Sequence, residues 1–265
     1  MNNLQDLVES FKERGEHPAI SFRDGEITKS ISYSELYSQI NNLAKGLLEI
    51  GLSKGDRVAL ISGNNPQWLG ASLAINYAGL VDVPRGEQTS DQELSYILDH
   101  SESKVAIIED AHVFSKIKDK AKENRIKVFS IEDIPGIEKT VALENLGKRS
   151  GFEMPRIGSS DLASIIYTSG TTGTPKGVEL THGNFASNID ATLKILEVTP
   201  DDKFLSVLPA WHIFERIMKY LSSASGAETF HTDQKHLLND FVEQKPTMVA
   251  SVPRIWERFY DGVMR

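Results

Sequence analysis

A segment dense in glycine and hydroxyl residues has the composition that binds phosphate. Residues 167–177 read YTSGTTGTPKG, and the apolar run at 162–167 that leads into them predicts a buried strand. In such a loop the glycines let the backbone approach a ligand closely, hydroxyls and backbone N–H groups donate to phosphate oxygens, and Lys176 adds a positive charge. The alternative is a surface turn with an incidental lysine, but the density of these residues after a strand favours a phosphate-binding loop.

Two common nucleotide-binding motifs do not describe this loop. Pro175 stands where a Walker A loop needs its second glycine, and Gly177 follows the lysine in place of Ser or Thr. The sequence also contains no G-x-G-x-x-G run of the dinucleotide-binding type. The loop therefore predicts phosphate binding without either of these architectures.

A second segment, LPAWHIFER at 208–216, contains a histidine at a strand-to-helix junction, a usual place for ligand binding. It lies between a predicted strand at 203–207 and a predicted helix at 212–224, and ligands of open α/β sheets usually bind where a strand ends. Taken alone, His212 is more simply a histidine at a helix start. Together with the upstream loop it becomes a candidate site residue.

The elements around these segments alternate in type. Apolar runs predict strands at 19–22, 31–33, 58–62, 80–83, 104–108, 126–129, 162–167, 203–207, 228–231 and 247–252, and helical patterns occupy 4–14, 34–50, 91–100, 113–124, 181–196, 212–224, 237–244, 253–263 and a stretch that begins at Pro66. An Asp-Gly turn at 24–25 predicts that the first two strands form a hairpin. Strands that alternate with helices imply an α/β fold of βαβ units, with mainly parallel sheets covered by helices.

Residues 130–160 are weakly patterned and rich in Pro and Gly, so we expect an irregular connection and a subdomain seam there. The prediction is a first α/β subdomain at 1–150 and a second α/β segment at 160–265 that contains the phosphate loop.

Composition excludes several classes of protein. The 265 residues carry a formal net charge of -8, which argues against a nucleic-acid partner, and no cysteine is present for disulfides, thiolate metal sites or nucleophilic catalysis. His231 and His236 are five apart and lack a second ligand pair, so no metal site is predicted from the histidines. No signal peptide and no transmembrane segment is recognisable. We expect a cytoplasmic protein, and contact with a membrane surface stays open.

Residues 168–177 resemble the phosphate-binding signature of the acyl-adenylate-forming synthetases, which is long and specific. The segment 208–216 is similar to this superfamily's Leu-Pro-x-x-His segment. Three features resemble the long-chain fatty acyl branch: the His212-x-x-Glu-Arg extension, the run VDVPRG at 81–86 with the helix that follows it, and VPRIWE at 252–257. That branch includes relatives that load acyl carrier protein in place of coenzyme A.

The resemblance implies a set of site residues. The β- and γ-phosphates of ATP would contact the loop residues Thr168, Ser169, Gly170, Thr171, Thr172, Gly173, Thr174 and Lys176, with Mg²⁺ near Thr168. His212 would order the reacting carboxylate and Trp211 would contact the substrate, so Lys176 and His212 are the expected catalytic residues.

The side chains around His212 have structural alternatives. Trp211, Phe214 and Met218 could line an acyl tunnel or simply fill the core, and Glu215 and Arg216 could form a structural ion pair.

The implied reaction has two steps and belongs to fatty acid metabolism. A long-chain fatty acid reacts with ATP to give acyl-AMP and pyrophosphate, and the acyl group then forms a thioester with coenzyme A or with acyl carrier protein. The resemblance covers part of the large N-terminal domain of such enzymes and none of their C-terminal domain. We therefore expect this chain alone to be inactive and to leave an open sheet edge. A non-catalytic ligand-binding or interaction fragment and an unrelated nucleotide hydrolase are the alternatives.

Overall fold

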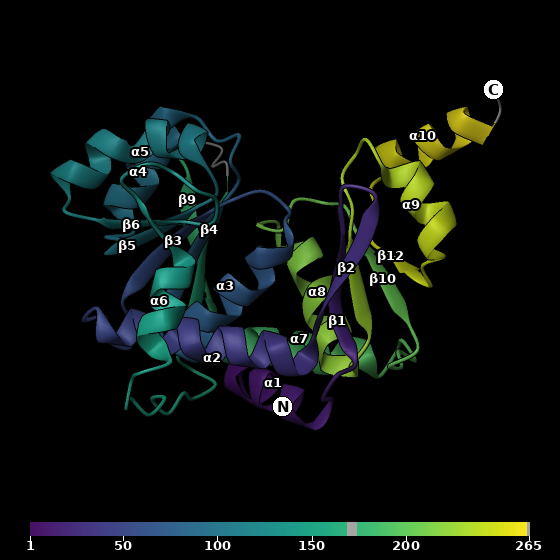
Figure 1. The fold of residues 1–265 in the computed structure, drawn as a ribbon, viewed down its shortest axis with the longest axis horizontal. Helices are drawn as coiled ribbons and strands as arrows, with labels where there is room; N and C mark the ends of the chain where they lie inside the picture. Colours follow the sequence, from purple (N-terminus) through teal and green to yellow (C-terminus); the bar gives the residue numbers. More distant parts are fainter. Residues whose placement is uncertain (169–173, 264–265) are drawn as a thin grey trace.

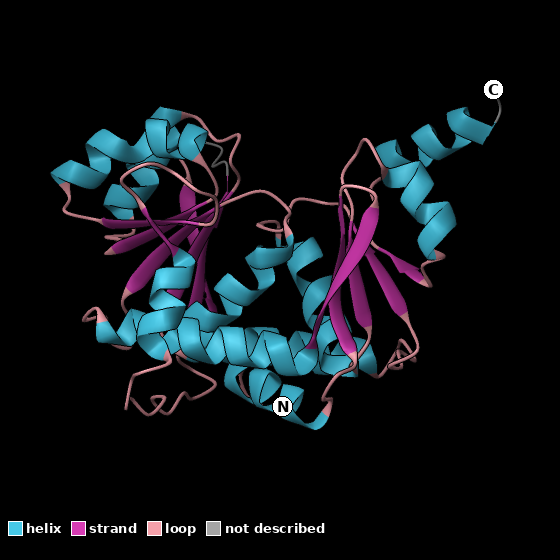
Figure 2. Ribbon diagram, viewed as in Figure 1, coloured by secondary structure: helices cyan, strands magenta, loops and turns pink. Residues whose placement is uncertain are grey.

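The computed structural model describes residues 1–168 and 174–263, whose strands form two sheets that lie side by side (Figures 1 and 2). In spatial order, the seven-stranded sheet contains β7 (Glu138–Lys139), β6 (Lys127–Ser130), β5 (Val105–Ile108), β3 (Arg57–Ile61), β4 (Val81–Arg85), β8 (Leu162–Thr168) and β9 (Lys176–Thr181). The five-stranded sheet contains β12 (Met248–Val249), β10 (Lys203–Ser206), β11 (Glu228–His231), β1 (Pro18–Asp24) and β2 (Ile27–Ser32). Within the described chain β8–β9 and β1–β2 pair antiparallel and the other named pairs are parallel, which confirms the predicted fold class.

Helices fill the space between the sheets and cover their outer faces (Figure 1). The inner group is α1 (Leu4–Glu9) with its 3₁₀ extension η1 (Ser10–Glu13), α2 (Tyr33–Glu49), α3 (Pro66–Tyr77), α7 (His182–Leu193) and α8 (Ile213–Ser225). On the outer face of the larger sheet lie α4 (Asp91–His100) and α5 (Ala111–Glu123), and the smaller sheet carries α9 (Leu237–Gln244) and α10 (Pro253–Val263).

Local capping chemistry starts several of these helices. Ser32 caps α2 in a capping box with Glu35, because each side chain bonds the other residue's backbone N–H. The side chain of Asn65 caps α3, and Pro66 occupies its first position, where a missing N–H costs nothing. These short-range signals explain why the helix starts could be predicted from the sequence.

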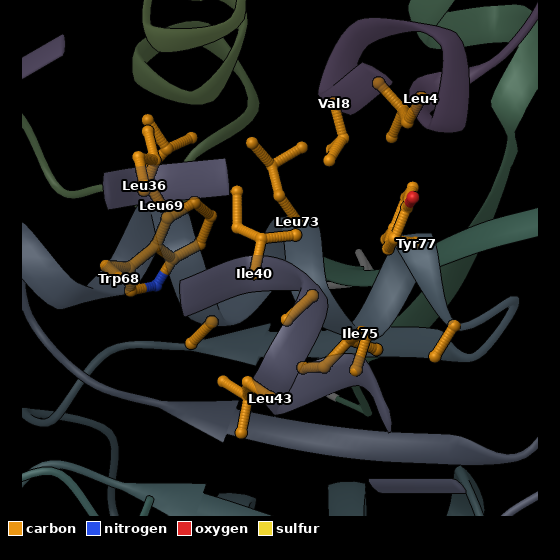
Figure 3. Packing of buried hydrophobic residues seen from close by; sticks show 14 of the residues in the cluster. Leu4, Val8, Leu36, Ile40, Leu43, Trp68, Leu69, Leu73, Ile75 and Tyr77 are labelled. Atoms are coloured by element: carbon orange, nitrogen blue, oxygen red, sulfur yellow. The ribbon is translucent and has the colours of Figure 1, made fainter. Parts of the chain in front are cut away.

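The main core lies where α1, α2 and α3 meet (Figure 3). Figure 3 shows Leu4 and Val8 from α1, Leu36, Ile40 and Leu43 from α2, and Trp68, Leu69, Leu73, Ile75 and Tyr77 from α3, packed together. The helix α3 is buried on nearly all sides, as expected for a helix that is apolar all round. It joins the inner faces of the two sheets into one core.

A fully buried arginine ties α8 to the larger sheet. Arg216 donates from Nη1 to Asp82 Oδ1 at 3.1 Å and to Ser164 Oγ at 2.9 Å, and from Nε to the Tyr220 hydroxyl at 2.8 Å. The ion-pair interpretation for Glu215 with Arg216 is wrong, because Arg216 pairs with Asp82 of β4 instead. A buried charge needs such partners, so this contact fixes the position of α8 against β4 and β8.

The expectation of an irregular connection at 130–160 is wrong for part of that stretch. It contains β7 and the helix α6 (Thr140–Gly147), which packs closely on α2. A Cβ at Gly46 would lie 2.0 Å from the carbonyl oxygen of Leu143, so the two helices approach more closely than larger side chains allow. Both sheets contain strands from before and after this stretch. The division into subdomains stays a prediction.

Candidate active site

The predicted phosphate loop connects the two strands of an antiparallel hairpin. Thr168, the last residue of β8, lies opposite Lys176, the first residue of β9. Thr168, Thr174 and Lys176 are all exposed at this open end of the hairpin, and Lys176 forms no ion pair with a described residue. The other predicted loop residues, Ser169, Gly170, Thr171, Thr172 and Gly173, lie outside the described part of the chain.

The base of the hairpin is tightly packed. A Cβ at Gly177 would lie 2.8 Å from Ile165 Cγ2, so a larger residue there would force the side chain of Ile165 to shift. The side chain of Tyr167 is buried, its hydroxyl lies 2.7 Å from His100 Nδ1, and burial raises the pKa of Tyr167 to about 12. This neutral, anchored tyrosine holds the end of β8 from which the loop departs.

His212 stands at the N-terminal cap of α8. Its backbone N–H donates to the carbonyl of Pro209 at 3.0 Å, and its own carbonyl accepts from the N–H of Arg216 at 3.1 Å, so the helix start is held on both sides. The imidazole is exposed at the surface of the site. Partial burial, and then the positive charge of Arg85, lowers the pKa of His212, which keeps the ring neutral at neutral pH.

A chain of ring and guanidinium contacts links the hairpin to this histidine. The rings of Trp211 and His212 stack with centroids 4.1 Å apart at 26°. The guanidinium of Arg85 lies 5.0 Å from the Trp211 ring centroid, and its Nη1 donates to the carbonyl of Tyr167 at 3.0 Å. A Cβ at Gly86 would lie 2.3 Å from Trp211 Nε1, so the indole packs directly on the backbone after β4.

An apolar cavity of about 630 Å³ opens beside His212. It is lined by Val207, Leu208, Pro209, His212, Ile213, Phe214, Glu215, Gln234, Val252, Arg254 and Ile255. Seven of the eleven lining residues are apolar, and the other four are His212, Glu215, Gln234 and Arg254. The cavity therefore suits a ligand with a polar end and an apolar body.

A buried polar cluster supports one wall of the cavity. Glu215 Oε1 accepts a hydrogen bond from the hydroxyl of Ser206, and Glu215 Oε2 is buried without a hydrogen-bond partner among the described residues. Lys219 donates to Asn64 Oδ1 at 2.7 Å. Burial raises the pKa of Glu215 and lowers that of Lys219 to about 7, so desolvation opposes both charges and their mutual attraction offsets it in part. The cluster fixes the turn that ends at His212.

Arg85 contacts both predicted segments and so links them. Only some of the predicted residues line the cavity. His212 and Phe214 line the cavity, whereas Trp211 packs against Gly86 and Arg85. Met218, on α8, packs against the main core and lines a second cavity together with Phe214. The roles assigned to these residues, and to Lys176 and Thr168, remain predictions about ligand binding.

Sequence reasoning missed several polar residues of this region: Asn64, Asp82, Arg85 and Lys219. Lys219 follows Glu215 by one helical turn, which is a spacing for an ion pair, but both lie on the polar side of α8, and the pattern does not indicate that they are buried. A clearer signal existed for Asp82, because it interrupts an apolar strand. Charged residues at such positions are buried and paired when the fold is stable. Nothing local identified Arg85 or Asn64.

Two features are absent from residues 1–168 and 174–263. No group of three or more His, Asp or Glu side chains is arranged there to hold a metal ion. Nor does any described helix combine the length and apolarity that crossing a membrane requires.

The fold is that of the N-terminal domain of an adenylate-forming enzyme, as solved structures make clear. A long-chain-fatty-acid–CoA ligase from Archaeoglobus fulgidus superposes with a TM-score of 0.85 at 25% identity, over 96% of this chain and 52% of that one. The apo structure of MatB from Rhodopseudomonas palustris superposes with a TM-score of 0.82 at 27% identity, over 97% of this chain and 51% of that one.

The sequence family described as AMP-binding enzyme matches residues 7–264, and the chain belongs to this family. A chloroplastic long-chain-fatty-acid–[acyl-carrier-protein] ligase of Arabidopsis thaliana is 31% identical over 258 residues, which is 89% of this chain and 36% of that protein. A fatty acyl-CoA synthetase of Dictyostelium discoideum is 30% identical over 88% of this chain and 37% of its own length. The chain thus spans little more than a third of these relatives.

Proposed function

We propose that this chain contributes the phosphate-binding loop and the carboxylate-positioning histidine of an AMP-forming long-chain fatty acid–CoA ligase. One observation carries the proposal: the hairpin that carries the exposed Lys176 is linked through Arg85 and Trp211 to a neutral histidine, and this histidine lines a cavity of about 630 Å³. An ATP-dependent fatty acid ligase needs these three parts next to one another. The family membership and the two relatives above support the same assignment.

The described residues fit the polyphosphate of ATP. Thr168, Thr174 and Lys176 are exposed at the open end of the hairpin, so two hydroxyls and an ammonium group are available to phosphate oxygens. We assign the β- and γ-phosphates to these residues together with the loop between them. Bound Mg²⁺, which we place near Thr168, would supply charge neutralisation for the phosphates.

The first step joins the fatty acid to AMP. A carboxylate oxygen attacks the α-phosphorus of ATP, and the bond to the bridging oxygen breaks, so that pyrophosphate leaves with the electron pair. The neutral imidazole of His212 orients the carboxylate at the mouth of the cavity, and Lys176 holds the leaving phosphates. Phe214 and the aliphatic residues of the cavity wall contact the start of the acyl chain.

The second step transfers the acyl group to a thiol. The sulfur attacks the acyl carbonyl, the thiol proton is lost, and AMP leaves. We assign coenzyme A as the acceptor. Acyl carrier protein is the second candidate, because the Arabidopsis relative described above is a ligase of that kind. A cytoplasmic location, with peripheral contact to membranes that supply the fatty acid, belongs to the same proposal.

A non-catalytic role is the candidate from another class. The chain spans about 36% of its Arabidopsis relative, so binding of ligand without turnover is compatible with the residues it contains. Such a chain would bind ATP or fatty acid and release no pyrophosphate.

Pyrophosphate release with ATP, Mg²⁺ and a long-chain fatty acid tests the proposal. We expect fatty-acid-dependent release from the protein that contains this chain together with the remaining part of its relatives' length, and none from this chain alone. Phosphate release from ATP without fatty acid would instead indicate a nucleotide hydrolase and would refute the assignment.

Lys176→Ala tests the phosphate assignment, with Lys118→Ala as the matched control. Lys118 is an exposed lysine on α5, on the outer face of the larger sheet. Loss of a hydrogen bond to a charged group costs about 1.5–3 kcal/mol, so we expect kcat/KM for ATP to fall by about tenfold to hundredfold in Lys176→Ala. Unchanged kinetics in Lys176→Ala, or an equal loss in the control, would remove Lys176 from the site.

A further inference from the structure

We propose that Arg85 is the positioning residue that couples the phosphate-loop hairpin to His212. Arg85 is the last residue of β4, the strand beside β8, and its side chain is only 12% exposed. This inference deepens the function proposed above for the same site and rests on it. It concerns how the phosphate-loop hairpin and His212 are held in position relative to each other, not which ligands they bind.

The guanidinium of Arg85 contacts three separate elements at once. Nη1 donates to the carbonyl of Tyr167 at the end of β8, and Nη2 pairs with the carboxylate of Glu93 on α4. The guanidinium itself lies against the ring of Trp211, which belongs to the turn between β10 and α8. A planar fork with several donors can hold such an arrangement, and a lysine ammonium group cannot reproduce it.

The Tyr167 contact reaches the phosphate loop directly. The carbonyl that accepts the Arg85 hydrogen bond belongs to the peptide group whose N–H is that of Thr168. Thr168 is the last residue of β8 and faces Lys176 across the hairpin. The position of Arg85 therefore determines where the loop leaves the sheet.

The Trp211 contact reaches the histidine. Trp211 is confined by the backbone at Gly86 and by the guanidinium of Arg85, and its ring stacks on His212. The imidazole therefore takes its orientation from a ring that Arg85 holds in place. β8 and β10 belong to different sheets, and Arg216 fixes the body of α8 against β4 and β8. Arg85 adds a link at the other end of β8, between the start of the loop and His212.

Arg85 also acts on His212 through its charge. Partial burial first, and then the charge of Arg85, lowers the pKa of the imidazole. The other charged groups near the site are Glu93, which pairs with Arg85, and Glu215 and Arg254 in the cavity wall. Loss of the Arg85 charge alone should therefore raise the pKa of His212.

Arg57 provides a matched control within the same sheet. It stands at the first position of β3, where Nε donates to the carbonyl of Ser101 at 2.7 Å and Nη2 pairs with Glu102. Like Arg85, it bonds backbone carbonyls and one carboxylate, but it lies at the opposite end of the parallel strands, away from Trp211 and His212. Its charge reaches the side chain of Tyr167, and it donates no hydrogen bond to the Tyr167 carbonyl. Arg57→Gln thus reports the general effect of losing such an arginine.

The test uses NMR spectroscopy of this chain, so it does not depend on catalysis. In Arg85→Gln we expect the amide resonance of Thr168 to shift and the pKa of His212, followed through its ring C–H resonance, to rise towards 6.5. In Arg85→Lys the pKa of His212 should stay close to that of the unsubstituted chain, because the positive charge remains. The amide resonance of Thr168 should still shift, because the planar guanidinium and its hydrogen bond to the Tyr167 carbonyl are lost. Arg57→Gln should change neither signal. Thermal melts identify variants that fail to fold.

The outcomes separate this inference from the proposed function. A folded Arg85→Gln variant in which the Thr168 or the His212 signal is unchanged overturns the coupling, as does an equal effect in Arg57→Gln. In the longer, active protein, Arg85→Gln should lower kcat by about tenfold to hundredfold, the cost of a misplacement of about 1 Å, with a smaller change in KM for ATP. If the unsubstituted longer protein shows no fatty-acid-dependent turnover, the proposed function is refuted, but the coupling measured by NMR still holds.

Discussion

His182 should make the stability of this chain depend on pH between 4 and 6.5. It is the first residue of α7, directly after β9, and its side chain is fully buried. The backbone N–H of Leu4 donates to Nδ1 at 3.4 Å, and Nε2 is buried without a hydrogen-bond partner among the described residues. Burial, opposed in part by the nearby Asp161, lowers the pKa of His182 to about 4 from 6.5.

The sign follows from proton linkage. Because the folded state holds His182 neutral down to about pH 4, the unfolded chain binds the proton first as the pH falls below 6.5. The stability is therefore fully present above pH 6.5 and is lost progressively down to about pH 4. The free energy of unfolding falls by about 2 kcal/mol at pH 5 and by about 3 kcal/mol once the pH is below 4, since each unit of pKa shift is worth about 1.4 kcal/mol.

Urea unfolding at pH 7 and pH 5 measures this loss. Other groups titrate in the same range, so the informative quantity is the difference between the unsubstituted chain and His182→Gln, which carries no titratable group at that position. We expect the pH-dependent loss to be smaller by about 2 kcal/mol in His182→Gln and unchanged in His112→Gln, a variant of an exposed histidine on α5. Equal losses in the unsubstituted chain and in His182→Gln would refute the reasoning.

Two further outcomes concern packing, and a third concerns the cavity. Arg216→Met should lower the free energy of unfolding by about 3–5 kcal/mol, since it leaves Asp82 buried without its partner, and adding Asp82→Asn should recover part of that loss. Urea unfolding of both variants checks this, and an additive double variant would contradict it. Gly46→Ala should destabilise the chain by about 1–3 kcal/mol, because the new Cβ would lie 2.0 Å from a backbone oxygen of α6, whereas Gly151→Ala, with nothing within 4 Å, should be nearly neutral in the same melt. In the active protein, Phe214→Ala should change the preferred acyl chain length, measured as relative kcat/KM across fatty acids; an unchanged preference would place the acyl chain elsewhere.

Local patterns in the sequence were sufficient for most elements of the fold. The helix 91–100 and the strand 228–231 were predicted with the boundaries that the structure has, since caps and apolar periodicity act over a few residues. The weak point was 130–160, where the helix α6 is stabilised by packing on α2 more than by any local signal. Tertiary contacts of that kind have no counterpart in a short window of sequence.

The sequence by itself determined the residue types of the two segments, which are glycines, hydroxyls and Lys176 between 167 and 177 and His212 after a strand. Through their resemblance to the adenylate-forming enzymes, it predicted phosphate and carboxylate binding for them. It also determined the alternation that produces parallel sheets. Only the tertiary structure decided that the second segment belongs to a different sheet from the first, and that Arg85 bridges them. The pairing of Arg216 with Asp82 was decided in the same way. These contacts join residues far apart in the chain, and their partners are selected by burial and geometry, which no local pattern encodes.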